Sequence, residues 1–236
     1  MNVVEIRRYP VKAMAGESLE SVSVSVDPRG LVGDRRFAVL DDDDRMATGK
    51  DSRRFRRRDA VFDFRATSTT EGVRVEGHGG SWLVGDPRLD EALTTHLGAL
   101  VRVAPEADVS FYDASPVSIV GTASLEWCRA HQGVDADVRR LRTNLLVATT
   151  EPFVEETWVG EAIRVGEVEL VVSERTERCR MVDIAQEGLP AQRGWLKALG
   201  RERDLCLGMY ADVTSAGRLA LGDVVDTGAV KHSARD

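Results

Sequence analysis

One cysteine lies between two arginines in the motif RTERCR at residues 175–180, directly after a hydrophobic run. Nearby cations favour the thiolate, the form of cysteine that binds a metal or attacks an electrophile. Free cysteine also packs as a small, inert hydrophobic residue. Two interpretations of Cys179 therefore stay open at this point: a metal ligand or nucleophile, and a buried structural residue.

Two further motifs place cationic side chains beside turn-forming residues. Lys12 ends the motif YPVK, and Arg35 lies in the motif GLVGDRR at residues 30–36. Cationic ends next to exposed backbone N–H groups suit a phosphate. The two motifs therefore predict a site for an anionic ligand.

The motif FYDASP at residues 111–116 and the motif RRLRTNLLV at residues 139–147 add polar side chains just before apolar strands. In the first, Asp113 accepts hydrogen bonds and Ser115 donates, although an Asx-type turn explains the same residues. In the second, Arg142 and Asn144 share one face of an extended segment and could clasp an anion, whereas a solvated strand start is the alternative.

Several common sites are excluded because their motifs are missing from the sequence. There is no GxGxxG after a strand, no GxxxxGK[ST], no GxSxG and no EF-hand loop. The three cysteines form no CxxC pair, and the histidines show no HExxH spacing. Disulfide frameworks, structural zinc sites and histidine metal sites are therefore not expected.

The elements that position these motifs are mainly strands. Apolar and polar residues alternate at 21–26, at 72–76 and again at 163–172, where Gly166 and Glu167 predict a tight turn between two strands. Gly222 and Asp223 predict a similar turn. The absence of a βαβ rhythm favours closed or sandwiched sheets over a doubly wound fold.

Helical spacing of apolar residues occurs in three segments, 89–97, 122–131 and 189–200. Gly98 is expected to end the first helix, and Thr122 or Ser124 to cap the second. Cys128 falls on the apolar face of the second helix and is expected to be buried. Pro190 is expected to begin the third helix.

The whole chain has 236 residues, of which 42% are hydrophobic and 30% charged, and a formal net charge of −7. This composition predicts a packed core and argues against sequence-independent nucleic-acid binding, which needs a basic face. No apolar run approaches the roughly 18 residues of a membrane span, and no secretory signal is visible. We therefore expect a cytoplasmic protein that binds no membrane.

Taken together, the motifs resemble those of the MOSC domain proteins that carry an N-terminal MOSC β-barrel domain. The order YPVK, GL..GDR, FYDASP, RRLRTN, ERC, the Gly208-Met209-Tyr210 segment and the Leu221-Gly222-Asp223 segment matches the family across nearly the whole chain. The resemblance implies a mostly β (α+β) fold with a few short helices. Its expected parts are a β-barrel-like N-terminal domain at 1–105, a MOSC β-barrel domain at 106–228 and a polar tail at 229–236.

The resemblance also implies a molybdenum cofactor (molybdopterin) between the two parts, with Cys179 as the ligand of the metal. By the same matching, the pterin and phosphate would be held by a set of polar residues: Lys12, Arg35, Asp113, Ser115, Arg139, Arg142 and Asn144. The best-known relatives are molybdenum-dependent oxidoreductases that reduce N-hydroxylated small molecules such as amidoximes and hydroxylamines. Three scattered cysteines are too few for an iron–sulfur cluster. A separate electron donor of the ferredoxin, flavodoxin or cytochrome type is therefore expected.

The sequence departs from the family at two places. Ala13 and Ala15 stand where the family reductases have a serine and a second lysine, and the threonine pair after the cysteine is replaced by other residues. Two alternatives to the reductase therefore stay open. Cys179 could carry a persulfide and deliver sulfur, or the protein could store and hand over the cofactor without catalysis.

Overall fold

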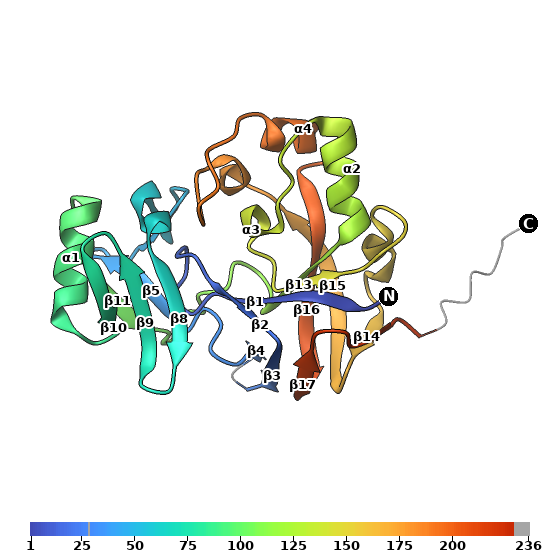
Figure 1. Cartoon of the computed structure of the whole chain (residues 1–236), viewed down its shortest axis with the longest axis horizontal. Helices are drawn as coiled ribbons and strands as arrows, with labels where there is room; N and C mark the ends of the chain where they lie inside the picture. The colour runs from blue at the N-terminus through green and yellow to red at the C-terminus, as the bar shows by residue number, and fades with distance from the viewer. Residues whose placement is uncertain (28, 229–236) are drawn as a thin grey trace, which may run out of the picture.

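The computed structural model describes residues 1–27 and 29–228, which form mostly strands and four α-helices (Figure 1). This confirms the mostly β fold class. The expected polar tail at 229–236 lies outside the described residues. Within the described part of the chain, no helix is both long and apolar enough to cross a membrane.

The largest element is an eight-stranded sheet in the order β18-β14-β15-β16-β12-β13-β1-β2. Its only parallel pair among the described strands is β12 with β13. In chain order its strands are β1 (Val3–Arg8), β2 (Glu17–Leu19), β12 (Val117–Gly121), β13 (Leu145–Val147), β14 (Ala162–Val165), β15 (Val168–Glu177), β16 (Cys206–Ser215) and β18 (Val225–Asp226). The hairpin predicted around Gly166 is confirmed as β14 and β15.

The remaining described strands form three smaller sheets, in the orders β17-β3-β4, β11-β5-β6-β7 and β10-β9-β8. The first contains β3 (Ser21–Val26), β4 (Arg29–Leu31) and β17 (Gly217–Ala220). The second contains β5 (Phe37–Asp41), β6 (Met46–Thr48), β7 (Phe55–Arg57) and β11 (Val101–Pro105). The third contains β8 (Arg65–Thr69), β9 (Gly72–Gly77) and β10 (Gly80–Leu83).

The helices are α1 (Pro87–Leu97), α2 (Thr122–Gln132), α3 (Val138–Leu141) and α4 (Trp195–Glu202), with short 3-10 turns η1 (Asp59–Asp63), η2 (Val154–Trp158) and η3 (Arg180–Asp183). Gly98 ends α1 in the left-handed conformation, as predicted. The expected cap of α2 is wrong: Gly121 is the N-cap, and the buried Glu155 carboxylate accepts from both Gly121 N (3.0 Å) and Ser124 Oγ (2.7 Å). A carboxylate there complements the positive end of the helix.

The helix α4 begins later than predicted, at Trp195 instead of Pro190. Residues 186–189 form a tight turn closed by the bridge Gln186↔Leu189, and Gly194 then starts the helix with a φ of 101°. The Pro190 carbonyl accepts from Arg140 (2.8 Å). This segment is therefore an ordered loop, because its polar groups find partners outside a helix.

The expected barrels are not closed by continuous hydrogen-bonded ladders. The edge strands β18 and β2 of the large sheet do not pair with each other in the described residues. The single bridge Asn2↔Val224 and the bond from Val3 N to Asp223 O (2.9 Å) bring the ends of the sheet together. Bulges in β1 and β15 bend the strands. The result is a curled, open sheet.

The strands of the N-terminal segment divide between two cores. β1 and β2 lie in the large sheet, and β3 pairs with β17, so these strands pack with residues of the C-terminal half. The second core lies under α1 and the sheets of residues 37–105, with Val61, Phe64 and Leu93 fully buried. Because Val11, Ala13 and Met14, between β1 and β2, also belong to the second core, the chain crosses more than twice between the two bodies seen in Figure 1.

A buried ion pair holds the loop before α4 against strand β1. Glu187, in the loop before α4, contacts Arg7 of β1 (2.6 Å), and the exposed fractions of the two side chains are 0% and 7%. The same carboxylate accepts from Gly16 N (2.6 Å). Burying a charge is costly unless it is paired and hydrogen-bonded, and here both conditions are met.

We expect Glu187→Gln to lower the free energy of unfolding by about 3 kcal/mol, because it leaves the buried Arg7 guanidinium without its main counter-charge. The measurement is denaturant unfolding of the purified protein. Glu71→Gln is the matched control, since Glu71 forms an exposed pair with Arg74 and its loss should change stability by less than about 0.5 kcal/mol. Equal effects of the two substitutions would contradict a stabilising role for the buried pair.

Candidate functional site

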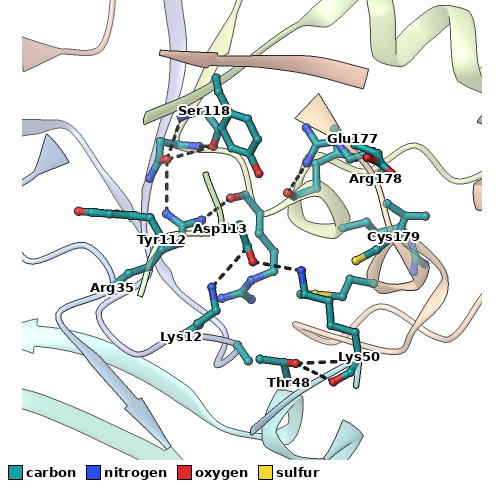
Figure 2. A pocket seen from close by; sticks show the side chains of 18 of the residues that line it. Lys12, Arg35, Thr48, Lys50, Tyr112, Asp113, Ser118, Glu177, Arg178 and Cys179 are labelled. Carbon is teal, nitrogen blue, oxygen red and sulfur yellow. Dashed lines mark hydrogen bonds and ion pairs between the residues drawn. The ribbon is translucent and has the colours of Figure 1, made fainter. Parts of the chain in front are cut away.

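A cavity lies between the two bodies, and its walls come from both. The lining residues are Lys12, Ala13, Arg35, Thr48, Lys50, Tyr112, Asp113, Ser115, Ser118, Arg140, Leu141, Arg142, Asn144, Glu177, Arg178, Cys179, Met181, Val182 and Tyr210. Seven of the eight predicted site residues are among them. The structure therefore brings together side chains that are far apart in the sequence (Figure 2).

Cys179 lies in the cavity wall where β15 ends and η3 begins. It is half-buried, and its extended backbone (φ −121°) places it just before the first residue of the 3-10 turn. The other two cysteines do not line the cavity, and burial raises the pKa of the Cys128 thiol to about 11. Cys179 is thus the cavity's thiol, whereas Cys128 is the inert core residue that was expected.

The two arginines beside Cys179 have different partners. Arg178 is buried and donates to the backbone oxygens of Leu207 (2.7 Å) and Leu141 (2.9 Å). Arg180 forms a two-point ion pair with Asp59 (2.7 and 2.9 Å). Arg178 therefore holds the thiol segment to the large sheet, and Arg180 holds it to the other body.

A carboxylate shared by two lysines forms the opposite wall. Asp113 lies 3.3 Å from Lys12 Nζ and 3.1 Å from Lys50 Nζ. Partial burial would raise the pKa of Asp113, but the two ammonium groups hold it below its ordinary value. Asp113 is thus a permanent anion between two cations.

Lys12 is the more deeply buried of these two lysines. The exposed fraction of its side chain is 7%, and Nζ donates to the Phe111 backbone oxygen (2.6 Å). Burial lowers the pKa of Lys12 to about 8, Asp113 opposes this shift, and the nearby Arg35 and Lys50 add to it. Lys12 therefore carries a charge at neutral pH that is lost more easily than that of an exposed lysine.

Arg35 and Arg142 form a third wall around the ring of Tyr9. Their guanidinium carbons lie 5.1 and 4.3 Å from the ring centroid. Arg35 donates to the Arg142 backbone oxygen (2.9 Å), and Arg142 donates to the Met14 backbone oxygen (2.7 Å). Both arginines, like Ala13, have positive φ angles (49°, 54° and 69°). Such strained positions cluster at functional sites.

Asn144 reaches the cavity, but its amide is already engaged. Oδ1 accepts from the backbone N–H (3.1 Å) and hydroxyl (3.0 Å) of Ser118, and Nδ2 donates to the Arg7 backbone oxygen (3.2 Å) and to Asp34 (3.2 Å). Asp34 also pairs with Arg35. Asn144 therefore fixes the neighbours of Arg35 rather than offering free donors.

Two predicted residues stand at the edge of the arrangement or outside it. Ser115 lines the cavity, and its hydroxyl lies 3.2 Å from that of Ser173. Arg139 does not line the cavity: it pairs with Asp137 (2.7 Å) and donates to the Glu187 backbone oxygen (3.1 Å). Because Arg139 faces its own helix cap, the expectation of a cofactor contact there is not supported by the geometry.

Sequence reasoning missed several cavity residues, foremost Lys50, Thr48 and Tyr210. The segment Thr48-Gly49-Lys50 lies between two charged runs, at residues 41–44 and 53–58, which are typical of solvated loops. Phe55 in the second run is buried, and the centroid of its ring lies 4.5 Å from Lys50 Nζ. The signal in the sequence that could have identified Lys50 is the small residue Gly49 before it, directly after a strand.

Two arginines that line the cavity each have a guanidinium nitrogen that could donate to an anionic ligand. Arg142 Nη1 and Arg178 Nη2 are buried and find no hydrogen-bond partner among the residues that the structure describes. Leaving a buried charged donor unpaired is costly, so such atoms mark places where a ligand oxygen or nitrogen fits. Together with a thiol for a soft metal, this donor set fits a phosphate-bearing metal cofactor.

Comparison with known proteins gives matches over most of the chain. Residues 1–98 match the MOSC N-terminal beta barrel domain, and residues 106–226 match the MOSC domain. The chain is 30% identical over 127 residues to mitochondrial amidoxime-reducing component 1 of Danio rerio, which covers 50% of this chain and 38% of that protein. It is also 31% identical over 98 residues to molybdenum cofactor sulfurase of Caenorhabditis briggsae. This match covers 40% of this chain and 13% of that protein. Less than half of each relative's length is therefore matched.

Among solved structures, the YUAD protein from Bacillus subtilis superimposes with a TM-score of 0.54 at 13% identity, over 95% of this chain and 93% of that one. At this low identity the match shows a shared fold and no more.

The lowered pKa of Lys12 predicts a pH-dependent stability. Between about pH 8 and the ordinary lysine value of about 10.4, the unfolded chain binds more protons at this position than the folded one, so the folded state gains stability as the pH rises. We expect the unfolding free energy of the wild type, minus that of Lys12→Met, to increase between about pH 7 and about pH 9.5. Denaturant unfolding of cofactor-free protein measures it, and a pH-independent difference would contradict the shift.

Proposed function

This chain belongs to the MOSC domain family, and on that premise we propose that it binds a molybdenum cofactor and reduces N-hydroxylated compounds, such as amidoximes and hydroxylamines. The observation that carries the proposal is the position of Cys179 in a cavity whose opposite walls are cationic and hold unpartnered guanidinium nitrogens. The similarity to an amidoxime-reducing protein supports the choice of reaction.

The cationic walls would hold the anionic end of the cofactor. Lys12, Arg35 and Arg142 would supply the positive charge, with Arg142 Nη1 as a free donor. Asp113 would keep Lys12 in place, and Ser115 could donate its hydroxyl at the rim. Asn144 would act indirectly, through the contacts that hold Asp34 and Arg35.

Cys179 would be the protein's ligand to the metal, because its thiolate form binds soft metals and no other cysteine lines the cavity. When bound, the cofactor supplies the two-electron redox chemistry. The chain's own residues bind and orient it, and the walls formed by both bodies limit access of water. The substrate takes up two electrons and two protons, and the N–O bond breaks to give the amine or amidine and water.

We propose that the electrons come from a separate protein of the ferredoxin, flavodoxin or cytochrome type. In the described part of the chain, the only group of three potential metal ligands is Asp41–Asp43, which contains no cysteine. An iron–sulfur cluster usually needs four thiolates. This proposal also accords with the small number of cysteines in the sequence.

The second candidate function is sulfur delivery through a persulfide on Cys179, which the similarity to a molybdenum cofactor sulfurase favours. A half-buried thiol in a cavity with cations suits this role as well. Cofactor storage without catalysis is the third. Ala13 lines the cavity without a polar group to offer, and Ala15 is buried, so neither adds a contact.

Cys179→Ala tests the proposed metal ligand. We expect protein from a molybdate-supplied host to lose about tenfold or more of its bound molybdenum. Mutating a residue that merely hydrogen-bonds to a metal ligand already lowers metal affinity roughly 10- to 100-fold, and Cys179 would be the ligand itself. Benzamidoxime turnover with a chemical electron donor should fall in parallel. Cys206→Ala is the matched control, since Cys206 is also half-buried and lies outside the cavity.

The outcomes separate the candidates. Equal molybdenum in the wild type and Cys179→Ala would contradict the metal-ligand role. A mass increase of one sulfur that depends on Cys179, with no turnover of benzamidoxime, would favour the sulfur carrier. Bound molybdenum without turnover or added sulfur would favour the storage protein.

A further inference from the structure

Lys50 is a cavity residue that the proposed cofactor contacts leave unused. Its ammonium lies between Asp113 and Cys179 (Figure 2). The exposed fraction of its side chain is 32%, against 7% for Lys12. Lys50 is therefore the more accessible of the two lysines, and its ammonium lies on the side of the shared carboxylate that faces Cys179.

The Lys50 ammonium retains hydrogen-bonding capacity. A lysine has three N–H donors, and among the described residues one contact goes to Asp113 Oδ1 (3.1 Å). The ring of Phe55 lies 4.5 Å away and supports the charge from one side. Because Asp113 is shared with Lys12, one carboxylate faces two ammonium groups, so the charge of this wall is only partly neutralised.

The position of Lys50 relative to Cys179 is set by one guanidinium. Arg180, next to Cys179, donates to the backbone oxygen of Gly49 and pairs with Asp59. A Cβ atom at Gly49 would lie 2.5 Å from Ile184 Cδ1 and 3.1 Å from Met181 Cγ, so the two segments are in close contact. Thr48 Oγ1 accepts from the Lys50 backbone N–H (3.3 Å). The backbone around Lys50 is thus held against the segment that follows Cys179, and this places the Lys50 side chain near the thiol.

We propose that Lys50 is a specificity residue that selects substrates carrying a carboxylate or similar anionic group close to the N-hydroxyl group. This inference rests on the proposed function, because it names the substrate class of the same cavity. An ammonium that is partly neutralised, half-open to solvent and fixed beside the thiol binds an anion without first breaking its own pairing.

The test compares charged and neutral compounds of matched shape. We expect wild-type protein to prefer 4-carboxybenzamidoxime to benzamidoxime in turnover, and benzoate to benzamide in calorimetric binding. Lys50→Met should raise the KM for the carboxylated substrate and weaken benzoate binding by roughly 10- to 100-fold, the effect of losing a charged hydrogen bond. The loss of kcat/KM should be about tenfold or more larger for the carboxylated substrate than for benzamidoxime.

Two further variants complete the design. Lys50→Arg should retain most of the preference, because it keeps the charge while removing the native lysine. Lys197→Met, on the exposed face of α4, is the matched control and should behave as the wild type. Thermal unfolding of each variant verifies that it is folded.

The outcomes distinguish this inference from the proposed reaction. Lack of turnover by the wild type, together with a benzoate preference that Lys50→Met abolishes, would overturn the reaction and support the role of Lys50. Equal losses for charged and neutral compounds, or a wild type without preference, would overturn the role of Lys50 whatever the reaction is.

Discussion

The buried carboxylate of Asp34 is the constraint on which the cavity depends. It is fully buried, accepts from the Tyr9 backbone N–H (2.7 Å) and from Asn144 Nδ2 (3.2 Å), and pairs with Arg35. A buried guanidinium is stable only when a counter-charge and hydrogen bonds replace water. Asp34 supplies both at the junction of three segments, so the position of Arg35 follows from that of the strands around it.

The same principle governs the other cations in and beside the cavity, but not all of them are fully compensated. Glu187 neutralises Arg7, and Asp113 is divided between Lys12 and Lys50. Arg142 and Arg178 are held mainly by backbone oxygens, and each keeps one buried nitrogen without a partner in the described residues. Backbone carbonyls orient a guanidinium without cancelling its charge. The cavity therefore combines rigid cations with remaining positive potential, which suits an anionic ligand.

The two bodies are coupled through the site rather than beside it. Strands β1 and β3 lie in the sheets of the C-terminal half, whereas the other core comes mainly from residues 37–105 and also includes Val11, Ala13 and Met14. The ion pair of Arg180 with Asp59 then ties the segment of Cys179 to that second core. A change in the spacing of the bodies would move the thiol and Lys50 together, since one guanidinium holds both segments.

The sequence by itself determined the alternating strands at 21–26, 72–76 and 163–172, the C-terminal end of α1, the burial of Cys128 and the motifs that supply Lys12, Arg142 and Cys179. These features depend on local periodicity and on residue types within a few positions. Only the tertiary structure decided that Glu155 binds the start of α2, that Arg139 lies outside the cavity and that Lys50 faces Cys179. Each of these depends on a contact between segments distant in the chain, because the energy of a buried charge is set by whatever partner the fold brings to it and not by its neighbours in sequence.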